Sequence, residues 1–405
     1  MNRFVIIIAV CCLCMTSSDV MAGQQTLLSE QEAVRAAQRV EGFDTVLCIM
    51  RQADAYFIVG KKGTCGYVVV SRLPDARRRI LGFSLTSRWT EKGMPDALTE
   101  WLDNISSVGN GNGGAEAKGG GLQQANSSRT SIAPLITSHW HQYSPYNDLA
   151  PVITDGNIKT VAGCVAIAAA QIIYYWRNEN PAATLKDTPT YIYGGAPVTV
   201  SIPKGTPNNW DLLRDSYTQD DSEESRAAVA QLCYVIGTTS YLNYANSTGG
   251  SIRDAATAMK LQYDLLNEYA THSKLSSAEW DELLYGELER QQPVLCGGNS
   301  GSSGHAFVLD GYDSATGLYH FNFGWGGSGD GYYPADGSTD AMGGYSDGQS
   351  IVYNIRPKSH DTPVENIKES TDEKDDVIYD LFGRRVTTTR PGTIYIIGGK
   401  KKTVL

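Results

Sequence analysis

The glycine-rich stretch SSVGNGNGGAEAKGGGLQQANSSRTS, residues 106–131, sets the strongest limit on how this chain folds. It has too few apolar side chains to bury a core, so it predicts a flexible linker that proteases reach easily. The 405-residue chain is therefore expected to fold as separate domains on either side of it.

The part before this linker, residues 23–105, is typical of a small α+β domain. Ser29 with Glu32 three residues later predicts a capped helix, and MPDALTEWLDNI predicts a second. Between them, TVLCIM, AYFIVG, GYVVVS and ILGFSL indicate four short strands.

The part after the linker, residues 132–357, has helical patterns first and strands later. Helices are expected after Gly163, in CVAIAAAQIIYY, and around 223–237, 251–261 and 277–290. Strands are expected in QPVLCGG, GHAFVLDGYD, LYHFNFGWGG, GYYPAD and QSIVYNIRP. This order predicts an α+β domain in which a helical part faces an antiparallel sheet.

The N-terminus predicts export. A positive start at Arg3, an apolar run and the small residues Val20 and Ala22 are typical of a secretory signal peptide, residues 1–22. We therefore expect a secreted or cell-surface protein. Five cysteines remain after its removal, so at least one thiol is unpaired, and a bridge between Cys48 and Cys65 is left open.

The C-terminal end changes composition again. Residues 358–376 form a charged linker, and residues 377–405 indicate a small β-rich module. The net charge of −10, without a large basic block, argues against a nucleic-acid partner.

Cys164 stands between Gly163 and a long apolar run. A buried cysteine is often a small core residue. At a helix N-terminus, however, the helix dipole favours a thiolate and makes the thiol a nucleophile. The local sequence leaves both interpretations open.

A nucleophilic thiol needs a base, and His305 is the best candidate. It begins an apolar strand after a glycine-rich loop, 141 residues after Cys164, a separation that fits papain-like enzymes. His139 and His141, in a segment before the cysteine, are interpreted as exposed loop residues. His320, in a strand, is given no role.

The motif HFNFGWGGSGDGYY follows His305. Asn322, 17 residues later, offers an oxygen that accepts from the imidazole and fixes its tautomer, and Trp325 would cover that bond. The alternative is a glycine-aromatic hairpin packed for stability. The acidic residues of this tract lack EF-hand spacing, so no metal is expected. A thiol nucleophile with a histidine base requires no cofactor.

Four segments together, SPYNDLAPVI, GCVAIAAAQIIYY, GHAFVLDGYD and FNFGWGGSGDGYY, resemble the streptopain family of papain-like cysteine peptidases. The resemblance runs from about residue 25 to 357. It implies a papain-like, two-subdomain catalytic domain, with GYVVVSRLPDARRRILGFS in an inhibitory propeptide domain. One departure is Phe323, where the family often has a second tryptophan. The C-terminal module resembles the sorting modules of Bacteroidetes proteins.

The resemblance also implies roles for residues. Cys164 would be the nucleophile and His305 its base, and Gln142 would complete an oxyanion hole with the Cys164 N–H. The orienting role stays open between Asn322 and Trp325. Substrate-binding positions are expected at Gly304, Ala306, Ser247 and Gly249.

The sequence therefore predicts a secreted cysteine endopeptidase made as a zymogen. It would cleave protein or peptide substrates through an acyl-enzyme, prefer an apolar P2 residue and be inhibited by its own propeptide. Secretion machinery would read the C-terminal module. The alternatives are a non-proteolytic thiol amidase or acyltransferase, and a surface adhesin with a structural cysteine. Alkylation by iodoacetamide separates the last of these, because a buried structural thiol is inert.

Overall fold

The computed structural model describes residues 27–358 with gaps, and four short strands near the C-terminus. The gaps fall at 45, 75, 77, 92–93, 110–128, 154–157, 180–181, 194–195, 200–201, 246, 302 and 336–340. The predicted signal peptide and most of both predicted linkers lie outside the described residues. The chain divides into two compact units, 1–358 and 359–405.

A ten-stranded antiparallel sheet runs through the first unit in the order β1-β2-β3-β4-β13-β12-β11-β10-β14-β9. Its strands are β1 (Cys48–Gln52), β2 (Tyr56–Gly60), β3 (Tyr67–Ser71), β4 (Ile80–Ser84), β9 (Leu265–Thr271), β10 (Val294–Ser300), β11 (Ser303–Asp313), β12 (Leu318–Asn322), β13 (Gly331–Tyr333) and β14 (Asp347–Pro357). Two small hairpins pair β5 (Val152–Ile153) with β6 (Ile158–Lys159) and β7 (Thr190–Tyr193) with β8 (Ala196–Thr199).

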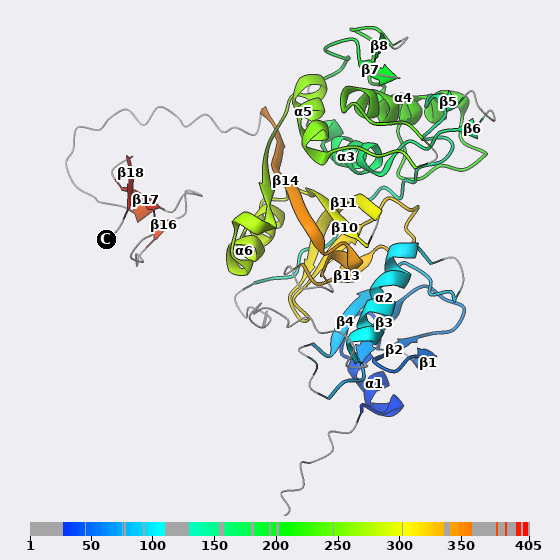
Figure 1. The fold of residues 1–405 in the computed structure, drawn as a ribbon, viewed down its shortest axis with the longest axis vertical. Helices are drawn as coiled ribbons and strands as arrows, with labels where there is room; N and C mark the ends of the chain where they lie inside the picture. The colour runs from blue at the N-terminus through cyan, green and yellow to red at the C-terminus, as the bar shows by residue number, and fades with distance from the viewer. Residues whose placement is uncertain are drawn as a thin grey trace, which may run out of the picture. The chain divides into compact units, whose positions relative to one another are not determined.

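Helices accompany this sheet (Figure 1). They are α1 (Glu30–Ala37), α2 (Asp96–Gly109), α3 (Cys164–Tyr175), α4 (Glu223–Thr239), α5 (Ile252–Tyr263) and α6 (Ser277–Glu289), with 3-10 turns η1 (Trp176–Asn178), η2 (Trp210–Leu212), η3 (His272–Lys274) and η4 (Ala341–Gly344). None of the helices in the described part of the chain is long and apolar enough to cross a membrane.

The two faces of strand β11 pack against different helices, because successive side chains of a strand point to opposite sides. Ala306 and Val308 join the core formed with α3, α4 and α5. Phe307 and Leu309 join the core formed with α2 and α6. The predicted α+β class is confirmed, with helices on both faces of the antiparallel sheet.

The N-terminal segment, residues 27–109, shares this sheet with the rest of the unit. Strand β4 pairs with β13, where Phe83 lies opposite Tyr332 and the two rings stack at 4.5 Å. Trp101 of α2 meets Tyr333 edge-on at 5.3 Å. The two domains predicted on either side of the linker therefore form one compact unit, since they share a sheet and a core.

Most predicted elements are found where the sequence placed them. Ser29 and Glu32 form the expected capping box at α1. Helix α2 continues to Gly109, four residues into the predicted linker. Strand β9 was not predicted, because its polar residues hide the strand pattern. Cys48 and Cys65 are free and exposed, so the bridge left open by the sequence is not formed.

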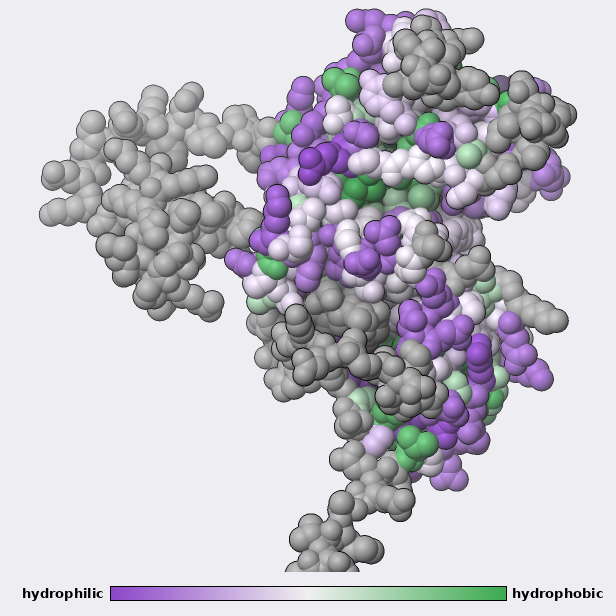
Figure 2. Space-filling model, viewed as in Figure 1, coloured by the Kyte–Doolittle hydropathy of each residue, from purple (hydrophilic) through white to green (hydrophobic). Residues whose placement is uncertain are grey.

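On the face shown in Figure 2, hydrophilic side chains cover much of the described surface, and apolar ones lie in small separate areas. In the second unit, β15 (Ile378–Tyr379), β16 (Arg385–Val386), β17 (Ile394–Ile397) and β18 (Lys400–Thr403) form a four-stranded antiparallel sheet. The predicted C-terminal module thus contains β structure.

Candidate active site

Cys164 is the first residue of α3. The preceding Gly163 has φ +94°, and a Cβ there would lie 2.9 Å from the Thr248 side chain, so the turn into the helix needs glycine. The thiol is partly exposed and accepts a hydrogen bond from the Ala306 N–H. Burial raises the pKa of the Cys164 thiol, although the neighbouring backbone N–H groups act in the opposite direction. The thiol is therefore protonated in this structure.

His305 lies near the start of β11, opposite Gly298 of β10. Its Nε2 is 2.8 Å from the Phe323 carbonyl oxygen, and its ring stacks on Trp325 with centroids 4.6 Å apart. Tyr345 closes another side at 5.0 Å. Burial lowers the pKa of His305 to about 4, and the Phe323 carbonyl only partly offsets it. The imidazole is therefore neutral at pH 7.

The structure thus brings the two predicted partners to adjacent positions. The Cys164 thiol lies against Ala306, the residue that follows His305. Among the described contacts, no hydrogen bond joins the thiol to the imidazole. Both groups are neutral, so the pair is assembled without being ionised.

The Nε2 hydrogen bond fixes how the imidazole acts. A carbonyl oxygen only accepts, so Nε2 carries a proton and Nδ1 is the nitrogen left to act as a base. A histidine base needs this tautomer, with the remote nitrogen held by an acceptor.

The acceptor is not the one expected from the sequence. The Asn322 oxygen accepts from Gln171 Nε2 at 2.9 Å and from the Gly324 N–H at 3.1 Å, while its Nδ2 donates to the Ser138 carbonyl at 2.8 Å. The amide is fully engaged away from His305. The sequence left the orienting role open between Asn322 and Trp325; in the structure the Phe323 carbonyl takes the hydrogen bond of His305 Nε2.

Trp325 lies where the sequence placed it, as a roof on the imidazole. Its plane is tilted by 20° from that of His305, and Phe323 stacks on its ring at 5.1 Å. Phe323 occupies the position of the expected second tryptophan. It therefore contributes an apolar ring to the stack and its carbonyl to the histidine.

A backbone hydrogen bond joins Gln142 to the segment just before Cys164. Its carbonyl accepts from the Ala162 N–H at 3.0 Å, two residues before the cysteine. Its side chain is partly exposed. Nearby, the Trp140 carbonyl accepts from Gly326 at 3.0 Å, which ties the same segment to the loop that carries Trp325.

The predicted substrate-binding positions also gather here. Gly304 is exposed beside His305, and Ala306 is buried with its N–H on the Cys164 thiol. Ser247 and Gly249 are exposed on a turn in which the Gly249 carbonyl accepts from Asn243. This turn approaches Cys164 through Thr248, whose hydroxyl donates to the Val161 carbonyl at 2.7 Å.

Helix α2 covers this region from the N-terminal segment. A Cβ on Gly301, in the turn between β10 and β11, would lie 2.6 Å from a Glu100 carboxylate oxygen. A Cβ on Gly329 would touch Pro95 at 3.4 Å and Trp325 at 3.7 Å. The N-terminal segment is therefore packed directly on the loops around His305.

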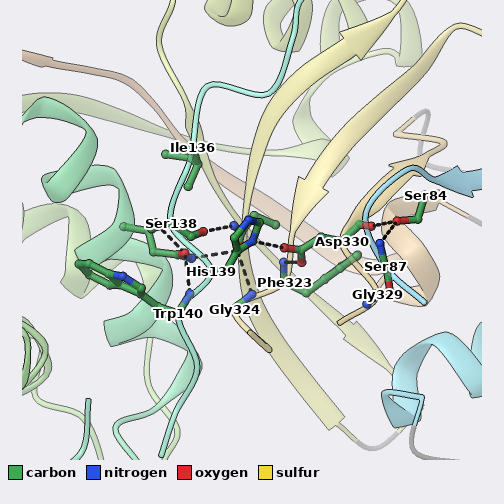
Figure 3. A network of polar contacts seen from close by, with 12 residues as sticks. Ser84, Ser87, Ile136, Ser138, His139, Trp140, Phe323, Gly324, Gly329 and Asp330 are labelled. Carbon is green, nitrogen blue, oxygen red and sulfur yellow. Dashed lines mark hydrogen bonds and ion pairs between the residues drawn. The ribbon is translucent and has the colours of Figure 1, made fainter. Parts of the chain in front are cut away.

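Sequence reasoning missed one pair. Asp330 accepts from the Phe323 N–H at 2.8 Å, and its other oxygen lies 3.8 Å from His139 Nδ1 (Figure 3). His139 is half-exposed, as expected, yet it faces a buried carboxylate. No local pattern marks this contact, because the two residues are far apart in the sequence.

One pocket lies apart from the candidate active site. It has a volume of about 580 Å³ and is lined by residues 130–135 with Tyr175, Tyr285, Glu289 and Gln291, none of which belongs to that site. No group of three or more His, Cys, Asp or Glu side chains suited to a metal ion is found among the described residues.

The chain is similar to known cysteine peptidases. Residues 140–333 match the model of the peptidase C10 family. Streptopain of Streptococcus pyogenes is 29% identical over 73% of this chain and 79% of its own length. The thiol protease/hemagglutinin PrtT of Porphyromonas gingivalis is 27% identical over 84% of this chain, which spans only 41% of that protein.

A solved structure shares the fold. A fragment of prointerpain A from Prevotella intermedia aligns with a TM-score of 0.60 at 25% identity, covering 77% of this chain and 99% of the fragment. The papain-like fold and the N-terminal propeptide domain predicted from the sequence are thereby confirmed.

Proposed function

We propose that this chain is a cysteine peptidase of the C10 family and that it is an endopeptidase made as a zymogen. The observation that carries the proposal is the placement of Cys164 at the start of α3, with its thiol against the residue that follows His305. Packing of the N-terminal segment on the loops around His305 supports the zymogen.

In this mechanism His305 Nδ1 takes the proton of the Cys164 thiol, and the sulfur attacks the carbonyl carbon of the scissile bond. The oxyanion is held by the Cys164 N–H and by Gln142. His305 then gives its proton to the leaving amine, and the C–N bond breaks to leave a thioester. A water molecule, deprotonated by the same nitrogen, releases the acid and restores the thiol.

The test is peptide cleavage by the processed protein. Cys164→Ala should abolish turnover and leave the fold intact, whereas Cys233→Ala, which removes the sulfur of a free cysteine in the core of the catalytic part, should leave turnover measurable. Residual turnover in Cys164→Ala would refute the assignment of the nucleophile. Hydrolysis of simple amides without cleavage of proteins would favour the alternative of a non-proteolytic amidase.

Processing is proposed to remove the N-terminal segment by cleavage between the end of α2 and Arg129. Arg129 is anchored to Asp281 at 2.7 Å and to Glu282 at 2.9 Å, and it lies over the Tyr285 ring. These contacts hold the start of the catalytic part in place. N-terminal sequencing of the processed protein tests the position of the cut.

Export is proposed from the predicted signal peptide alone, and sorting from the β-rich module at the C-terminus. Expression of the full chain in a bacterial host, followed by mass spectrometry of cells and medium, tests both. Retention of an uncleaved N-terminus inside the cell would contradict export.

A further inference from the structure

The orientation of the His305 imidazole depends on the backbone of one residue, Phe323. Phe323 accepts from His305 Nε2 through its carbonyl and donates its own N–H to Asp330 Oδ1, both at 2.8 Å. The position of the carbonyl is therefore set from the other side of the residue by a carboxylate. A displacement of that carboxylate would be passed to the imidazole through one residue.

Asp330 is a buried residue. Only 1% of its surface is exposed, and its Oδ2 has no hydrogen-bond donor among the described residues. The nearest opposite charge to Oδ2 is His139 Nδ1 at 3.8 Å. A buried carboxylate with a free oxygen is costly unless a positive charge stands beside it. The charged form of His139 supplies that charge.

Figure 3 shows Asp330 between His139 and the N-terminal segment. On that side, the Ser84 hydroxyl donates to the Asp330 carbonyl at 2.5 Å, and the Ser87 hydroxyl accepts from the Gly329 N–H at 2.9 Å. The N-terminal segment therefore holds the backbone of Gly329 and Asp330, and the Asp330 side chain in turn holds the Phe323 N–H.

We propose that Asp330, with His139 as its counter-charge, is a positioning residue of the peptidase: its carboxylate holds the Phe323 residue whose carbonyl orients His305. The inference rests on the proposed function, since it assigns His305 as the base. Neither residue touches the reacting atoms.

The electrostatic surroundings of His139 support this role. The Asp330 carboxylate is the main cause that raises the pKa of His139, against burial, and Asp215 and Asp310 act in the same direction. The charge of His139 in turn acts to lower the pKa of His320, which pairs with Asp310 at 2.6 Å. His139 is thus held in its charged form over a wider range of pH than a free histidine.

The experiment measures kcat, KM and the pH dependence of kcat/KM for the full chain after processing, with wild-type enzyme added in trace amounts to process slow variants. Asp330→Asn should lower kcat about tenfold and leave KM within about twofold, because positioning acts on the transition state. It should also move the alkaline limb to lower pH by about half a unit, since a looser Phe323 carbonyl stabilises the imidazolium less.

Asp310→Asn is the matched control. Asp310 is also buried, pairs with a histidine and accepts from a backbone N–H at 2.9 Å, but it does not contact Phe323. It should lower the melting temperature without moving the alkaline limb. An equal shift in both variants, or none in Asp330→Asn, would overturn the proposal.

His139→Gln completes a double-mutant cycle. If the pair acts as one unit, combining it with Asp330→Asn should cost no more than Asp330→Asn alone. Persistence of the alkaline limb in His139→Gln assigns that limb to His305 and supports the proposal. Full additivity of the two losses would contradict it.

Iodoacetamide alkylation separates this proposal from the proposed function. In a Cys48→Ser/Cys65→Ser background, Cys164 is the remaining partly exposed thiol among the described cysteines, and its alkylation rate against pH reports the thiol-imidazole pair without turnover. If peptides are not cleaved but Asp330→Asn still shifts this profile, endopeptidase function fails and positioning stands. An unshifted profile with normal cleavage refutes positioning alone.

Discussion

Acid should destabilise the full chain through His305. Burial holds the pKa of His305 at about 4 in the folded chain, against an ordinary value of 6.5 when unfolded. Because the folded pKa is the lower one, the unfolded chain binds the proton first, and stability is lost as the pH falls below 6.5 towards 4. The loss attributable to this group is about 2 kcal/mol at pH 5 and about 3 kcal/mol at pH 4.

The assay is urea unfolding of the Cys164→Ala chain, which cannot process itself, followed by tryptophan fluorescence at several pH values. The comparison variant carries His305→Gln in addition to Cys164→Ala. Between pH 7 and pH 5 the first chain should lose about 2 kcal/mol more than the second. The difference isolates His305 from the carboxylates, which titrate in both chains.

His320 provides a control of opposite sign. Burial disfavours its charge, but the Asp310 carboxylate at 2.6 Å more than offsets this and raises its pKa. Its contribution is present below the unfolded pKa and is lost as the pH rises through the folded pKa, so His320→Gln should make acid more damaging. Equal losses with and without His305, or a folded His305 imidazole that titrates near 6.5 by NMR, would refute the reasoning.

Three further predictions concern the same site and its release. Trp325→Ala should lower kcat and raise KM in a folded enzyme, whereas Asn322→Ala should cost about 3 kcal/mol of stability because three hydrogen bonds are lost; kinetics and thermal unfolding separate the two. Arg129→Ala should add cuts downstream of residue 129, seen by N-terminal sequencing, because it frees that segment from Asp281 and Glu282. A peptide library should show a preference for an apolar P2 residue, as the family resemblance implies, and a strong preference for a basic P2 residue would contradict that expectation.

The local elements could be predicted because each carries its own signal. The helix cap at Ser29 and the alternation of apolar and polar residues in the strands depend only on residues that are close in the sequence. The sheet that joins the two sides of the linker could not, since the Phe83–Tyr332 pairing links residues about 250 apart and has no local signature. Strand β9 is held by its pairing with β14 rather than by its own pattern.

The same distinction between what the local sequence indicates and what only the fold determines applies to the candidate site. Cys164 and His305 could be proposed from the sequence because the chemistry assigned to their side chains constrains residue type and spacing. The acceptor for His305 could not be identified from the sequence because it is a backbone carbonyl, which every residue has. Gly324, with φ +70°, turns the chain after Phe323, and the Asn322 amide caps that turn. Spacing along the sequence cannot distinguish a side-chain oxygen from the backbone oxygen of the next residue.

The burial that shapes the site also disfavours ionisation of the pair. Burial raises the pKa of the Cys164 thiol and lowers the pKa of the His305 imidazole to about 4, so it opposes transfer of the proton from the thiol to the imidazole.

Water and substrate carbonyls can reduce this effect of burial only by reaching the pair. The Phe307, Phe323 and Tyr345 rings around the imidazole share one core with Leu98 and Trp101 of α2. We propose that removal of the N-terminal segment takes away that side of the core and admits solvent next to His305. Release would then raise the pKa of His305, so that burial of the imidazole and obstruction by the segment together hold the zymogen inactive.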